Sequence, residues 1–61
     1  MKLTLEINMD NAAFEDMPGI EAARILRIAA RKIEGAESTD RASFPLMDSN
    51  GNRVGQVSVE D

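Results

Sequence analysis

Cysteine, histidine, tryptophan and tyrosine are all missing from this chain of 61 residues, and phenylalanine occurs only twice. Without cysteine the chain can form neither a disulfide nor a thiolate metal site, and without histidine it lacks the commonest imidazole ligand and general base. The remaining residues show no pairing of a nucleophile with a base that would support acid–base or covalent catalysis. We therefore expect no metal, no cofactor and no enzymatic activity.

Long apolar runs are missing as well. The first residues include Glu6 and no apolar stretch of signal-peptide length, and no later segment approaches the length of a membrane span. Eleven acidic against seven basic residues give a net charge of −4, which disfavours a general attraction to nucleic-acid phosphate. We expect one small domain over residues 1–61, with one thin core, in the cytoplasm and away from membranes.

Apolar and polar residues alternate at the start of the chain, where Leu3, Leu5 and Ile7 are separated by polar side chains. This period of two predicts a half-buried strand over residues 2–8. Asp10 and Asn11 are good helix N-caps, so residues 9–17 should contain a single helical turn that packs Phe14 against the core.

A longer helix is predicted over residues 18–34, which are mostly strong helix formers. Pro18 suits the first position of a helix, and Gly35 suits the position just past its end. At about 100° per residue, one narrow stripe should face the core. Its members are Ala22, Leu26, Ala29 and Ile33, with Ala23, Ile25 and Ala30 at its margins.

The pair Asn50-Gly51 predicts a β-hairpin, because both residues tolerate the positive φ angles of a type I′ turn. With these two as the loop, Met47 faces Val54 and Leu46 faces Gly55. Because Gly55 has no side chain, it would leave space for a large neighbouring side chain or for a close approach of the helix. This register sorts the apolar residues onto one inner side of the sheet. They are Phe44, Leu46, Val57 and Val59.

Three side chains around this turn, Asp48, Asn50 and Asn52, have the spacing of the first ligands in a calcium loop. The match ends there, because Arg53 and Val59 stand where an EF-hand loop needs glycine and glutamate. We therefore assign the three residues to the turn and its flanks.

The predicted fold class is α+β, with the order β-α-β-β and a short loop at residues 36–41. Pro45 lacks a backbone donor, so residues 42–48 should form an edge strand, and residues 53–60 should form the central one. The result is a three-stranded antiparallel sheet in the order 1-3-2 with one helix on one face. Parallel pairing of the first and second strands is the alternative.

Two surfaces are candidates for partner binding. On the outer helix face, the predicted helix and its cap carry four basic and two acidic residues, although the whole chain is acidic. An apolar centre with an arginine rim is typical of an interaction hot spot. This face comprises Ile20, Arg24, Arg27, Ile28 and Arg31. The second surface is the uncovered sheet face near the turn, where Met47 and Val54 form an apolar pair.

Three segments of the chain resemble a group of small, mostly uncharacterised proteins of tailed phages, prophages and related mobile elements. They are Asp-Asn-Ala-Ala-Phe at residues 10–14, Ala-Arg-Ile-Leu-Arg at 23–27, and Asp-x-Asn-Gly-Asn-x-Val-Gly at 48–55. The resemblance covers most of the chain and implies a phage product that acts in the bacterial cytoplasm. Small phage proteins that are not virion parts commonly bind a host protein, including components of antiviral defence.

The function we expect is therefore a non-enzymatic protein-binding module, whose partner is a host protein or a second copy of the chain in a homodimer. One alternative is a nucleic-acid-binding regulator that uses Arg24, Arg27 and Arg31, although the acidic remainder and the scarcity of aromatic residues make it the least favoured. The other alternative is a sponge for an anionic nucleotide signal, with the arginines gathered across an oligomer interface.

Overall fold

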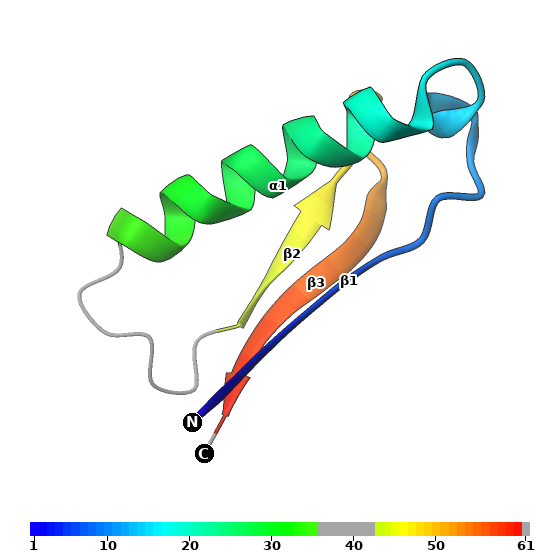
Figure 1. Cartoon of the computed structure of the whole chain (residues 1–61). Coiled ribbons are helices and arrows are strands. Elements are labelled where there is room, and N and C mark those ends of the chain that lie inside the picture. The colour runs from blue at the N-terminus through cyan, green and yellow to red at the C-terminus, as the bar shows by residue number, and fades with distance from the viewer. Residues whose placement is uncertain (36–42, 61) are drawn as a thin grey trace.

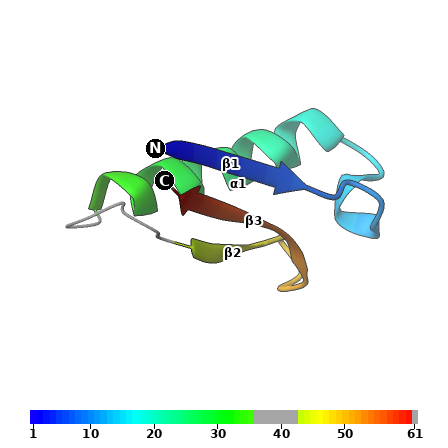
Figure 2. The same cartoon turned by 90° about the horizontal axis from the view of Figure 1, so that it is seen from below.

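The computed structural model describes residues 1–35 and 43–60. In chain order these contain β1 (Lys2–Ile7), the short 3-10 helix η1 (Ala12–Phe14), α1 (Pro18–Gly35), β2 (Ser43–Met47) and β3 (Arg53–Glu60). The strands form one antiparallel sheet in the order β1-β3-β2, and α1 lies over one face of it (Figure 1, Figure 2). The predicted fold is confirmed, and the parallel alternative is excluded. The predicted loop at residues 36–41 and the start of the second strand at residue 42 lie outside the described residues.

The two edge strands, β1 and β2, both pair with the central strand β3. Along β1 the register runs from Lys2 opposite Glu60 to Ile7 opposite Gly55, which brings the two ends of the chain together (Figure 1). Along β2, Asp48 just beyond the strand donates its N–H to the Asn52 carbonyl at 2.9 Å. Backbone groups alternate in direction along a strand, so Pro45 turns its nitrogen, which has no hydrogen, to the free edge.

The hairpin loop between β2 and β3 has three residues, Ser49, Asn50 and Gly51, and not the two that the sequence predicts. The N–H of Gly51 donates to the Asp48 carbonyl at 3.1 Å, and Asp48 and Asn52 close the loop. Gly51 has φ of +83°, the left-handed conformation that a three-residue loop requires at its last position.

A β-bulge absorbs the extra loop residue. Leu46 still lies opposite Gly55, as predicted, but Met47 lies opposite Arg53, so Val54 is the additional residue of β3. Val54 is only 8% exposed and belongs to the core, whereas Met47 is 45% exposed. The prediction that Val54 lies beside Met47 on the uncovered face is therefore wrong, because the bulge turns its side chain inward.

The core lies between the sheet and α1. Ile25, Leu46 and Val57 are almost completely buried, and Phe14, Ala29 and Val54 complete the cluster. On the inner side of the hairpin, the predicted set is confirmed. Leu46, Val57 and Val59 are buried, and Phe44 is half-buried and packs against the cluster.

The core-facing side of α1 is rotated from the predicted stripe. Its buried residues are Glu21, Ile25 and Ala29. Of the predicted stripe, Ala29 is buried and Ala22 and Ile33 pack against the core, whereas Leu26 is 46% exposed. Ile28, predicted on the outer face, is half-buried instead. The helix ends at Gly35, one residue later than predicted. The rotation buries Ile25 and also Glu21, whose polar contacts are described below, while the alanines of α1 all lie on the Leu26 side of Ile25.

Two local features fix β1 and its connection to α1. Asn11 caps η1 by accepting the N–H of Ala13 at 3.1 Å, and Phe14 is buried, as predicted. A Cβ on Gly55 would collide with the carbonyl oxygen of Glu6 in β1, and it would lie 3.0 Å from the Cα of Ile7. Gly55 therefore admits the backbone of the neighbouring strand, where the sequence suggested a large side chain or the helix.

Candidate functional site

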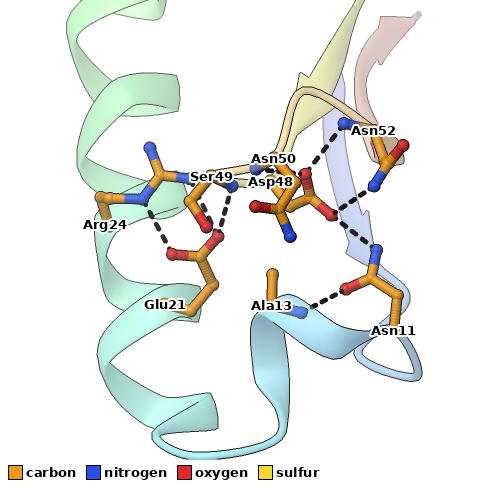
Figure 3. Close-up of polar contacts among 8 residues, drawn as sticks. All are labelled: Asn11, Ala13, Glu21, Arg24, Asp48, Ser49, Asn50 and Asn52. Atoms are coloured by element: carbon orange, nitrogen blue, oxygen red, sulfur yellow. Dashed lines mark hydrogen bonds and ion pairs between the residues drawn. The ribbon is translucent and has the colours of Figure 1, made fainter.

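Asp48 organises the turn end of the molecule (Figure 3). Its Oδ1 accepts the backbone N–H groups of Asn50 and Asn52 at 2.9 and 2.8 Å. Its Oδ2 accepts the side-chain amides of Asn11 and Asn52 at 2.6 and 3.4 Å. The assignment of Asp48, Asn50 and Asn52 to the turn is confirmed, and Asn11 extends this network to η1.

Glu21, in the first turns of α1, joins the helix to the same loop (Figure 3). Its carboxylate accepts Nε and Nη2 of Arg24, each at 2.9 Å, and the backbone N–H of Ser49 at 2.8 Å. The Glu21–Arg24 contact is an ion pair within one turn of the helix. The sequence offered one signal for it, a glutamate three residues before an arginine on a helix.

The pKa of each of these two carboxyl groups lies below its ordinary value. For Glu21 the largest cause is the hydrogen bond from Arg24, which with the Ser49 N–H outweighs burial. For Asp48 the largest single influence is burial, which raises the pKa, but the hydrogen bonds from Asn52, Asn11 and Asn50 together outweigh it. Both groups are therefore ionised at neutral pH, and their hydrogen bonds hold the fold together.

A shallow groove of about 120 Å³ runs between α1 and the edge strand β2. Ile28 and Met47 line it from the two sides, with Arg24 and Lys32 as its cations. At one end the Nζ of Lys32 lies 5.3 Å from the centroid of the Phe44 ring, a cation–π distance. The remaining lining residues are Ile25, Pro45, Leu46 and Asp48.

The groove brings together parts of the two surfaces that the sequence singled out separately. Arg24, Ile28 and Met47 all line it, while the exposed Arg27 and Arg31 belong to the adjoining outer face of α1. Ile20 is also exposed and does not line the groove. Val54 is buried and does not line the groove, so it is not part of the site. Lys32 and Pro45 were not among the predicted site residues, because their approach to Ile28 depends on how α1 lies over the sheet.

A second, wider hollow lies at the bulge, where β1 leaves the sheet. It has a volume of about 510 Å³ and overlaps a neighbouring hollow of about 470 Å³. The larger hollow has a mainly polar lining that includes Glu6, Asp10 and Arg53, whose guanidinium donates to the Gln56 side chain at 2.9 Å. In the part of the chain that the structure describes, no three acidic side chains come together as a metal site would require.

Comparisons with protein-family models, with curated proteins and with solved structures gave no significant match to this chain. No helix among the described residues is long and apolar enough to cross a membrane.

Proposed function

We propose that this protein is a non-enzymatic protein-binding module, whose groove between α1 and β2 takes an apolar side chain from an acidic segment of another protein. The observation that carries the proposal is the lining of the groove. Ile28 and Met47 supply apolar surface, and Arg24 and Lys32 supply cations beside it. Arginine around an apolar centre is the composition enriched at interaction hot spots. The segment that complements this groove has an apolar side chain flanked by carboxylates.

The dimensions of the groove set the affinity. A volume of about 120 Å³ admits roughly one aliphatic side chain, whose burial contributes about 1.5–3 kcal/mol. The cations around it, with Arg27 and Arg31 beyond, add attraction that salt weakens and that acts mainly on the association rate. Binding of a short peptide in the millimolar range, with a marked dependence on ionic strength, is the expected behaviour.

The polar network supports a binding role over a catalytic one. Asp48 and Glu21 are the two buried charged residues of the described part, and their oxygens are occupied by hydrogen bonds within the protein. No described buried side-chain nitrogen or oxygen lacks a partner. A general acid or base needs a carboxyl group that can reach a substrate, and these two groups serve the fold.

The resemblance to small phage and prophage proteins suggests the setting. We place the protein in the bacterial cytoplasm, as an accessory protein that binds and inhibits a host protein such as a component of antiviral defence. An acidic and apolar segment of that host protein would occupy the groove.

The direct test uses short synthetic peptides that carry one leucine between glutamates, and matched peptides with lysine in place of glutamate. Titration into ¹⁵N-labelled protein should shift the amide signals of α1 and β2 with the acidic peptide only. Arg31→Glu and Met47→Glu should each weaken binding about tenfold, equivalent to about 1.4 kcal/mol. Arg53→Glu, the same charge change on another part of the surface, is the matched control.

Two results would contradict the proposal. One is the absence of shifts at millimolar acidic peptide, and the other is equal binding by the Arg31→Glu, Met47→Glu and control proteins. A duplex DNA titration runs alongside, because the nucleic-acid alternative predicts binding that Arg31→Glu abolishes and that weakens steeply with salt.

A further inference from the structure

The two edges of the sheet differ in how well they are protected. On β2, Pro45 occupies the free edge and removes a donor from its middle. On β1, the N–H of Asn8 donates to the Val54 carbonyl at 2.7 Å, which fixes the alternation of the preceding residues. Leu3, Leu5 and Ile7 therefore turn their backbone N–H and C=O groups away from β3, to an edge with neither a proline nor a bulge.

The surface on the β1 side is also apolar. Leu3 is 47% exposed, although its strand position places it on the same face as the core. On α1, Leu26 projects about 100° from the buried Ile25, away from the Arg24 and Ile28 that line the groove at β2. Leu26 therefore lies on the flank of the helix away from β2. An unpaired strand and exposed leucines on one side of the molecule are typical of a surface that a partner covers.

We propose that the partner at this edge is a second copy of the chain, paired antiparallel through β1 so that two sheets join into one of six strands. The charges of the strand support this choice. With the two-fold axis at Thr4, Lys2 of each copy lies opposite Glu6 of the other, and Leu3 lies opposite Leu5. This register also brings the outward-turned backbone groups of Leu3 and Leu5 together, as hydrogen bonding requires.

Other pairings of the same strand are poorer. An axis at Leu5 would place Lys2 opposite Asn8, and an axis at Leu3 would place it opposite Thr4, so each loses the Lys–Glu pairs. A parallel arrangement in register would place Lys2 opposite Lys2. Because the axis is perpendicular to the sheet, both helices lie on the same face and Leu3 is covered by apolar neighbours of the other copy. A seam of one strand is smaller than a standard interface, so dimerisation in the micromolar range is expected.

Charge reversal tests the register directly, because the side chains of Lys2 and Glu6 are exposed. Sedimentation equilibrium of the whole chain from 5 μM to 1 mM should give a monomer–dimer equilibrium. Lys2→Glu and Glu6→Lys should each weaken it about tenfold, since two symmetry-related pairs become repulsive. An equimolar mixture of the two variants should restore dimerisation as a heterodimer, and the double variant K2E/E6K should restore the homodimer.

Matched controls are Arg31→Glu and Glu15→Lys, exposed charge reversals away from β1 that should leave the equilibrium unchanged. Leu3→Pro blocks the free edge without removing a hydrogen bond to β3 and should yield a monomer, with folding confirmed by circular dichroism. A monomer at 1 mM would overturn the proposal. A dimer that neither charge reversal weakens, or that the mixture fails to restore, would overturn it equally. These readouts are independent of peptide binding in the groove.

Discussion

Substitution of Val54 with alanine tests the bulge that moves this side chain from the surface to the core. In the two-residue hairpin expected from Asn50-Gly51, Val54 and Met47 would form an exposed pair, and truncating either would cost little. In the structure Val54 is 8% exposed and Met47 is 45% exposed, so the two substitutions should differ sharply.

The size of the effect follows from the atoms removed. Val54→Ala deletes two methyl groups, each worth about 0.8 kcal/mol when buried. The cavity left in the cluster adds to this loss, for a total of about 2 kcal/mol. A domain of this length has a free energy of unfolding of about 3 to 9 kcal/mol, so the variant should lose a large share of it. Met47→Ala should change it by less than about 0.5 kcal/mol.

Urea unfolding followed by circular dichroism measures both values. The midpoint should fall for Val54→Ala at an unchanged slope, and the melting temperature should drop by about 8–16 °C. Both variants are measured at the same protein concentration, so that dimerisation through β1, away from Val54 and Met47, contributes equally to the two values. If both variants lost the same small amount of unfolding free energy, Val54 would lie at the surface and the bulge would be refuted.

Glycine and carboxylate variants test the remaining contacts. Gly55→Ala should destabilise the protein by about 1–3 kcal/mol, because its Cβ would collide with the carbonyl oxygen of Glu6. Gly19→Ala, which meets no atom within 4 Å in the first turn of α1, should instead stabilise it by up to about 1 kcal/mol in the same urea titration. The lowered pKa values of Glu21 and Asp48 mean that the folded protein binds fewer protons than the unfolded chain. Their contribution is present at neutral pH and is lost as pH falls from about 4.5 through the lowered pKa values. The double variant E21Q/D48N should be less stable at pH 7 and should show a flatter decline between pH 5 and 2, and an unchanged decline would contradict this assignment.

The two proposed surfaces lie on opposite sides of the molecule. The groove is on the side of β2, and the free edge is β1. A dimer through β1 would carry one groove at each end, so that a partner with two acidic segments could be bound with increased avidity. Such a dimer would also keep Arg24, Arg27 and Arg31 away from the seam. It therefore gives no support to the idea of arginines gathered across an interface around a nucleotide.

Periodicity and turn-forming residues in the sequence were sufficient to predict the helix, the strands and the order of the strands in the sheet. Strict alternation specifies β1, and Pro18 and Gly35 bracket α1. Pro45 predicts the edge strand through its missing donor, and the strand order confirms it. These features act within a few residues, so no knowledge of the rest of the fold was needed to find them.

The rotation of α1, the bulge at Val54 and the groove were decided by tertiary structure. The alanines of α1 all lie on the Leu26 side of Ile25, so the apolar pattern alone centres the predicted core face too near Leu26. The observed orientation instead buries Ile25 and lets Glu21 accept the Ser49 N–H. Those two groups are 28 residues apart in the chain, a separation that no local pattern spans. The length of the hairpin loop depends likewise on Asp48, whose carboxylate bonds to the loop and to Asn11 at once. The sequence therefore determined which elements form, because their causes are local. The faces that the elements expose were set by hydrogen bonds and packing that exist only once the chain has folded.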